Sequence, residues 1–149
     1  MRVVVSTCWD EAYKPLALIA DPILRRYCTK RGYGYEPFAY HESPKALDSF
    51  GDRGKIAQYM KLYATGRYDA MMFLDIDALV MNSEVRVEDV LQSAPFVWSY
   101  DVNGPCSGFW IARRASLAVS SGSPVTATRI ASFGCSSVAI WLSSRSGFI

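Results

Sequence analysis

Two acidic residues, Asp75 and Asp77, are the residues of this 149-residue sequence whose types and spacing most clearly suggest a chemical function. They directly follow the apolar run from Met71 to Leu74, which predicts a buried strand. Carboxylates where a buried strand meets its loop are costly unless a positive charge compensates them. Oxygen ligands of this kind suit Mg²⁺ or Mn²⁺, which often share them with substrate phosphates. Because the motif is short, an ordinary strand end with two solvated acids stays open as the alternative.

Other phosphate-handling motifs fail on this sequence. A dinucleotide-binding fingerprint fails because Pro37 stands where the third glycine belongs. A Walker A loop fails because Ser49 occupies the position of its first glycine. A phosphatase of the haloacid dehalogenase type needs later acids for its metal, and no acid follows Asp101.

Strands alternate with helices around the Asp-x-Asp motif. Strands are expected over residues 2–6, 35–40, 70–74, 95–100 and 108–112, and helices over 10–31, 55–65 and 86–92. This alternation predicts a mostly parallel sheet with helices on its faces. Ligands of such sheets bind beyond the carboxyl ends of the strands, where Ser6–Trp9 and Asp75–Asp77 are both expected.

The first helix has a clear apolar periodicity. Its expected buried face consists of Tyr13, Leu16, Ala17, Ala20, Ile23, Leu24 and Tyr27. The pair Asp21-Pro22 is expected to kink or restart this helix, because proline suits a first turn better than an interior. Gly32 follows two basic residues and predicts the carboxyl end of the helix.

The composition of the chain changes sharply after Arg114. All 14 acidic residues lie before this point, whereas residues 115–149 contain ten serines, two arginines and no acid. We therefore divide the chain into residues 1–114, which carry the expected function, and an atypical serine-rich tail, 115–149. The tail is either a divergent extension or a sequence translated from another reading frame.

Several segments of residues 2–114 occur in an order that one group of enzymes shares. Val3–Tyr13 opens the chain before a long helix, and Arg26–Tyr33 combines a tyrosine, basic residues and Gly-Tyr. Lys55 precedes the Asp-x-Asp segment Phe73–Asn82, and Cys106–Arg113 forms a glycine-containing apolar segment that ends in arginine. In this order the segments resemble nucleotide-sugar glycosyltransferases of the GT-A fold, namely the glycogenin-like family 8 and the galactosyl- and xylosyltransferases of family 34.

The resemblance implies an α/β domain of the GT-A type, with a Rossmann-like, mostly parallel sheet flanked by helices and apparently truncated. Asp75 and Asp77 would hold Mn²⁺ or Mg²⁺, which bridges the two phosphates of the donor and neutralises the leaving nucleoside diphosphate. Lys55 would lie near the diphosphate or the donor sugar. A solvated lysine in the first turn of a helix is the alternative for this residue.

The resemblance also implies contacts to the rest of the donor and to the acceptor. The nucleoside would be contacted by residues at the end of the first strand and just after it, namely Thr7, Trp9, Asp10 and Tyr13. The Tyr13 ring would stack on the base, expected to be uracil, although a core role is equally compatible with its place in the helix periodicity. Ile76, between the two acids, belongs to the expected donor-binding set. Asp101 and Ser107 would border the acceptor.

The sequence departs from the family pattern at two points. Cys106 stands where these enzymes usually have asparagine. They also take a third metal ligand, a histidine, from a late segment, whereas the only histidine here is His41 on an early loop. Nucleotide binding could survive this loss, but turnover would suffer.

We therefore expect transfer of a sugar from a UDP-linked donor to a hydroxyl group of a carbohydrate or protein acceptor. Catalysis would depend mainly on metal and charge stabilisation of the leaving diphosphate, since no residue is identified as nucleophile or general base. Two alternatives stay open: a non-catalytic nucleotide-sugar-binding fragment, and a structural α/β domain with an incidental Asp-x-Asp.

Charge and hydropathy limit the expected partners and compartment. The formal net charge of +2 argues against a nucleic-acid-binding protein, which would carry a clustered basic face. The apolar runs are far shorter than the roughly 18 residues that a membrane span needs. Because no signal or anchor is apparent, we expect the cytoplasm, or the Golgi if the chain is a fragment of a longer family member.

Overall fold

The structure is a computed structural model that describes residues 1–39, 52–101, 104–114, 128–131 and 139–140. Its elements in chain order are β1 (Val3–Trp9), α1 (Lys14–Arg31), β2 (Gly34–Tyr35), β3 (Phe38–Ala39), α2 (Asp52–Ala64), β4 (Ala70–Asp75), β5 (Leu79–Val80), α3 (Val87–Leu91), β6 (Phe96–Asp101), β7 (Gly104–Arg113), β8 (Thr128–Ala131) and β9 (Ala139–Ile140). Because most of residues 115–149 lie outside the described residues, the division at residue 114 stays a prediction.

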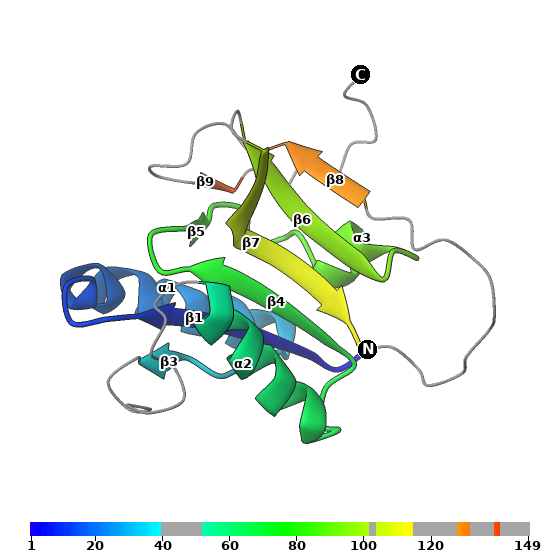
Figure 1. The fold of residues 1–149 in the computed structure, drawn as a ribbon, viewed down its shortest axis with the longest axis horizontal. Helices are drawn as coiled ribbons and strands as arrows, with labels where there is room; N and C mark the ends of the chain where they lie inside the picture. Colours follow the sequence, from blue (N-terminus) through cyan, green and yellow to red (C-terminus); the bar gives the residue numbers. More distant parts are fainter. Residues whose placement is uncertain (40–51, 102–103, 115–127, 132–138, 141–149) are drawn as a thin grey trace.

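A central sheet has the strand order β2-β1-β4-β7-β6-β8, and β3 extends it by pairing with β1 (Figure 1). The pairings of β1 with β2, β3 and β4 are parallel, as is that of β6 with β8. In contrast, β7 runs antiparallel to both of its neighbours, β4 and β6. The expected α/β fold with a mostly parallel sheet and flanking helices is therefore confirmed, with one reversed strand inside the sheet.

Helices cover both faces of this sheet, and alternate strand residues belong to two separate cores. On one face, Val5 and Leu74 share a cluster with Leu24 from α1 and with Val87 and Leu91 from α3. On the other face, Val4, Phe73 and Trp110 share a cluster with Leu62 from α2. Figure 1 shows α2 in front of β1 and β4, with α1 and α3 behind the sheet. Burial on both sides explains why residues 3–5 of β1 and 70–74 of β4 are continuously apolar rather than alternating.

Helix α1 follows the predicted periodicity only in part. Its buried residues are Ala17, Ala20, Leu24, Tyr27 and Cys28. The expected burial of Tyr13 and Leu16 is wrong, since they are 48% and 42% exposed. Pro22 does not break the helix, because it lies with Leu18 on the exposed side, where water can satisfy the carbonyl that loses its partner. Gly32 ends the helix as predicted, with a φ of 70°.

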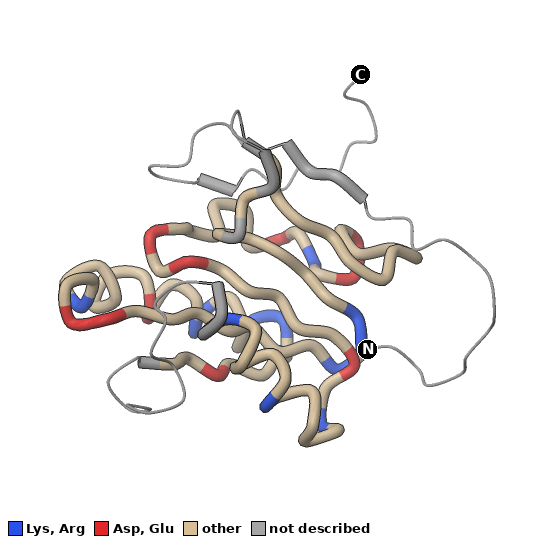
Figure 2. The backbone as a smooth tube through the Cα atoms, viewed as in Figure 1, with Lys and Arg blue, Asp and Glu red and all other residues tan. Residues whose placement is uncertain are grey.

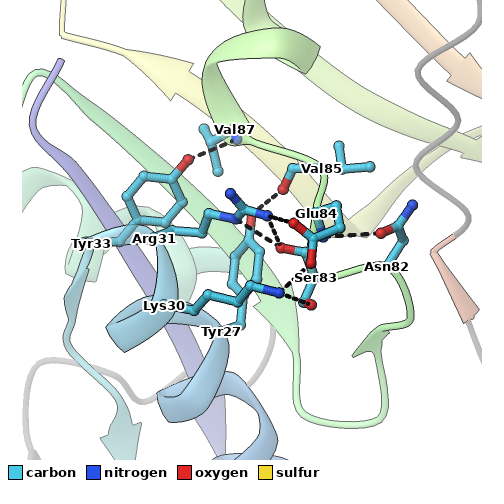
Figure 3. Close-up of polar contacts among 9 residues, drawn as sticks. All are labelled: Tyr27, Lys30, Arg31, Tyr33, Asn82, Ser83, Glu84, Val85 and Val87. Carbon is cyan, nitrogen blue, oxygen red and sulfur yellow. Dashed lines mark hydrogen bonds and ion pairs between the residues drawn. The ribbon is translucent and has the colours of Figure 1, made fainter.

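The carboxyl end of α1 is anchored to the segment that connects β5 to α3 (Figure 3). The Tyr27 hydroxyl donates a hydrogen bond to the Val85 carbonyl at 3.0 Å. Arg31 donates from Nε to the Ser83 carbonyl at 2.7 Å and from Nη2 to Glu84 Oε2 at 2.8 Å. Lys30 forms a second ion pair with Glu84. These contacts hold α1 against the sheet at the end opposite to its first turn.

Several strands differ in extent from the prediction. One strand was expected over 35–40, but β2 and β3 are separated by Glu36 and Pro37, and proline has no N–H for the ladder. β6 and β7 extend over Asp101 and Gly104, where a loop was expected, because the two strands form an antiparallel hairpin. A register shift between Trp98 and Ser99 accommodates this longer pairing.

Two further observations bear on the expected partners. Among the helices of the described part, none is long and apolar enough to cross a membrane. Lys and Arg are interspersed with Asp and Glu along the described backbone (Figure 2).

Candidate functional site

The carboxyl ends of β1 and β4 lie side by side, as the sequence predicts. In their parallel register, Thr7 pairs with Leu74 and Cys8 pairs with Asp75. The end of the first strand and the Asp-x-Asp motif therefore share one edge of the sheet (Figure 1). This is the edge at which ligands bind in α/β folds of this kind.

Asp75 forms an ion pair with Lys55 from α2. The lysine Nζ lies 2.7 Å from Asp75 Oδ1 and 5.3 Å from the centroid of the Phe73 ring. Lys55 is only 7% exposed, so its position in the helix faces the sheet rather than solvent. The alternative of a solvated first-turn lysine is therefore wrong. A buried ammonium requires such a partner, because its transfer from water is otherwise prohibitive.

Gly108 of β7 closes the other side of the Asp75 carboxylate. The antiparallel register pairs Leu74 with Phe109, which places Gly108 opposite Asp75. A Cβ atom at position 108 would lie 2.9 Å from Asp75 Oδ2 and 3.5 Å from Cys106 Sγ. Glycine is thus the residue that leaves room for this carboxylate.

Asp77 has a different environment from Asp75. The chain turns directly after β4, and the Ala78 N–H donates to the Asp75 carbonyl at 2.9 Å. In this turn Asp77 is exposed, whereas Ile76 is 4% exposed and belongs to the core. One carboxylate is therefore held by protein groups, and the other is presented to solvent.

The two carboxylates fit a hard divalent cation by their chemistry. Both supply oxygen, the ligand that Mg²⁺ and Mn²⁺ prefer. Within the described ranges, no group of three or more His, Cys, Asp and Glu side chains could hold a metal ion. A cation at Asp75 and Asp77 would thus take its remaining ligands from water and from substrate phosphates, as Mg²⁺ sites commonly do.

The residues expected to contact the nucleoside lie at or just after the end of β1, and they differ in burial and in hydrogen bonding. Thr7 is fully buried, and its Oγ1 has no hydrogen-bond partner among the described residues. Trp9 is half-buried against a small cluster that contains Ile76. Asp10 Oδ1 accepts a hydrogen bond from the Tyr13 N–H at 3.0 Å, and the 48% exposed Tyr13 side chain is accessible for stacking. A nucleoside can therefore reach Tyr13 directly, but Thr7 only after its neighbours move.

The residues expected at the acceptor are placed only by their backbones. Asp101 ends β6, and Ser107 lies within β7. His41 lies outside the described residues. The assignments of these residues stay predictions.

Gln58 is a further residue of this region that the sequence motifs do not single out. It follows Lys55 by three positions on α2, so both side chains lie on the same helix face. Gln58 is 6% exposed, and its Oε1 has no hydrogen-bond partner in the part of the chain that the structure describes. The sequence signal for Gln58 would have been its spacing of three residues from Lys55, which places two polar side chains on one face of the helix.

Comparison with known proteins supports the fold. No protein-family model and no curated protein matches this chain. A glycosyltransferase involved in the glycosylation of the major capsid of PBCV-1 matches 76% of this chain, with a TM-score of 0.57 and 12% identity. The catalytic domain of Drosophila β1,4-galactosyltransferase 7, in complex with xylobiose, matches 76% with a TM-score of 0.52 and 16% identity. A197 from STIV matches 76% with a TM-score of 0.50 and 16% identity.

These matches cover 60%, 49% and 65% of the three solved chains, respectively. The present chain therefore spans about half to two thirds of their length. At such low identity the likeness shows a glycosyltransferase-like fold and does not single out a family.

Proposed function

We propose that this chain binds a nucleoside diphosphate sugar and transfers the sugar to a hydroxyl group of a carbohydrate or protein acceptor. The observation that carries the proposal is the position of Asp75, which ends β4 directly beside the end of β1 and faces Lys55. A donor with two phosphates needs cationic groups at such an edge. Fold neighbours that are themselves glycosyltransferases add support at the level of the fold.

In this proposal Asp75 and Asp77 hold Mn²⁺ or Mg²⁺, and Lys55 contacts the diphosphate or the donor sugar. The cation supplies charge neutralisation for the departing nucleoside diphosphate. The exposed Tyr13 ring stacks on the base, for which uracil is the proposed identity. Trp9 and Asp10 position the nucleoside at the end of β1.

A non-catalytic nucleotide-sugar-binding protein is the second candidate. Within the described residues, the two carboxylates lack a third protein group of the kind that would complete a metal site. Such a site can bind a diphosphate through shared ligands and still hold the cation too loosely for turnover. An assay of sugar transfer and of donor hydrolysis with several UDP-sugars separates this candidate from the enzyme.

Calorimetric titration of UDP with and without Mn²⁺ tests the donor site. We expect saturable binding that requires Mn²⁺ and that weakens by about 10–100-fold in Asp77→Asn, because the amide lacks the negative charge of the carboxylate and keeps only one of its two oxygens. Asp89→Asn is the matched control, since Asp89 is an exposed acid on α3 away from this edge. A chain that is folded by circular dichroism but does not bind UDP contradicts the proposal. It would favour a structural α/β domain instead.

A further inference from the structure

We propose that Lys55 and the divalent cation compete for Asp75. The cation then binds tightly only when a diphosphate replaces Asp75 as the ion-pair partner of the Lys55 ammonium. The inference rests on the proposed function and deepens it, because it makes metal and nucleotide binding mutually dependent. Three features carry it: the burial of Lys55, the confinement of the Asp75 carboxylate, and the exposure of Asp77.

The first feature is that Lys55 uses Asp75 as its counter-ion. The lysine side chain is 9% exposed, whereas the side chain of Asp75 is 35% exposed, and their charged atoms are 2.7 Å apart. An ammonium this deeply buried depends strongly on the carboxylate that it contacts. Separation of this ion pair therefore costs free energy, which binding of a second cation at Asp75 must offset.

The second feature is that the carboxylate has little freedom to turn away from Lys55. Its Oδ1 contacts the lysine, and its Oδ2 lies against Gly108, where even a methyl group would approach to 2.9 Å. A cation that reaches Asp75 from solvent must consequently share this carboxylate with the ammonium. Positive charges a few ångströms apart in a half-buried site repel each other more strongly than they would in water.

The third feature is that Asp77 is exposed and can meet a cation before Asp75 does. A diphosphate that arrives with the cation brings several negative charges, which can bind both the metal and the ammonium. The flexible four-carbon stem of lysine allows Nζ to move from the carboxylate to a phosphate oxygen. Each ligand thereby increases the affinity of the other, and the increase must be reciprocal.

The inference is tested by calorimetric titration of MnCl₂ in the absence and presence of UDP. For Lys55→Met we expect Mn²⁺ alone to bind about 5–150-fold more tightly than to the parent chain, the usual range for coupled sites. We also expect UDP to enhance Mn²⁺ affinity far less than it does in the parent. Lys61→Met is the matched control, since Lys61 is an exposed lysine on the same helix, and it should behave like the parent.

Two further measurements guard against a variant that does not fold. Lys55→Gln removes the charge but keeps a hydrogen-bond donor for Asp75, and it should show the same tighter Mn²⁺ binding. In the unmutated chain, the ¹³Cε resonance of Lys55, assigned by its absence in Lys55→Arg, should shift when Mg²⁺ is added alone.

The outcomes separate this inference from the proposed function. Mn²⁺ binding that is equal or weaker in a folded Lys55→Met chain overturns the competition and leaves the donor site standing. A Lys55 resonance that saturating Mg²⁺ does not move has the same meaning. If the folded parent chain does not bind UDP in the presence of Mn²⁺, both proposals are overturned.

Discussion

Gly108, which has no side chain, leaves the space that the Asp75 carboxylate occupies beside Lys55. In Gly108→Ala the new methyl group would lie 2.9 Å from Asp75 Oδ2, so the carboxylate must move away from its place beside Lys55. We expect Mn²⁺-dependent UDP affinity to fall about tenfold or more. Overpacking should also lower the free energy of unfolding by about 1–3 kcal/mol.

Gly34→Ala is the control for this prediction, measured by the same titration and by chemical unfolding. A Cβ atom at position 34 would approach the Tyr68 ring to 2.7 Å, at a point where β2 pairs with the first half of β1. It should therefore destabilise the fold without changing UDP affinity. Equal losses of affinity in both variants would mean that Gly108 acts through global stability alone.

The sequence predicts the individual residues of the site unevenly. Asp75 and Asp77 stand out as candidates because a buried strand that ends in two acids is a local pattern. The ion pair of Asp75 with Lys55 and the close approach of Gly108 depend on how α2 and β7 pack against β4, which no local pattern contains. The burial of Thr7 does not follow from the sequence pattern either, because β1 continues beyond its expected end at residue 6.

Helix α1 carries its anchoring contacts at one end and the candidate nucleoside residues at the other. In Arg31→Met, the Ser83 carbonyl and Glu84 lose their hydrogen bonds from a side chain that is only 16% exposed (Figure 3). We expect the free energy of unfolding to fall by about 1.5–3 kcal/mol, the range for hydrogen bonds that involve charged groups. Denaturant unfolding measures this change.

Arg26→Met is the matched control, because Arg26 is an exposed arginine on the same helix. Its effect should stay within about 0.5 kcal/mol, as for most surface substitutions. UDP affinity should be unchanged in both variants, since Arg31 lies at the far end of α1 from Tyr13. A loss of affinity in a folded Arg31→Met chain would show that the anchor also positions the site.

At the level of elements, apolar periodicity predicted the type of α1 and most of its buried face. It could not tell that Tyr13 and Leu16 are exposed, because periodicity does not show where a helix begins or which of its turns pack on the sheet, and Tyr13 precedes the first residue of α1. It also could not tell that α1 is continuous through Pro22. This residue is exposed, so water can satisfy the carbonyl that loses its partner to the missing N–H.

For the whole molecule, buried tyrosines predict that stability declines in alkaline solution. Burial, together with a hydrogen bond to Glu88, raises the pKa of Tyr33 to about 12. Burial likewise raises the pKa of Tyr27 and of Tyr35 above the usual value for tyrosine. The unfolded chain therefore releases these protons near pH 10, whereas the folded chain retains them.

Stabilisation by these groups is complete below about pH 10 and is lost as the pH rises from there through the pKa values of the folded state. Denaturant unfolding between pH 8 and 11.5 should show a falling free energy of unfolding above pH 10. Tyr33→Phe should make this decline shallower, although it also removes the acceptor of the Val87 N–H. A pH-independent free energy of unfolding over this range would contradict the assigned burial of the tyrosines.

The overall architecture was predictable because the strands and helices expected from the sequence alternate over residues 2–92. The reversed strand β7 was not, since its apolar residues look alike in a parallel or an antiparallel neighbour of β4. The direction of β7 follows from the β6–β7 hairpin, which reverses the chain, rather than from the composition of β7. The short strand β5 was missed because two residues carry too little periodicity.

The same reversed strand has a consequence for how the chain is made. During synthesis β4 leaves the ribosome well before β7, whose first residue is Gly104. For a few seconds, at about 5–20 residues per second, one edge of β4, apolar over residues 70–74, has no partner. Unpaired edges of this kind promote association between chains. The nascent polypeptide is therefore open to association through this edge between the emergence of Leu74 and that of Phe109.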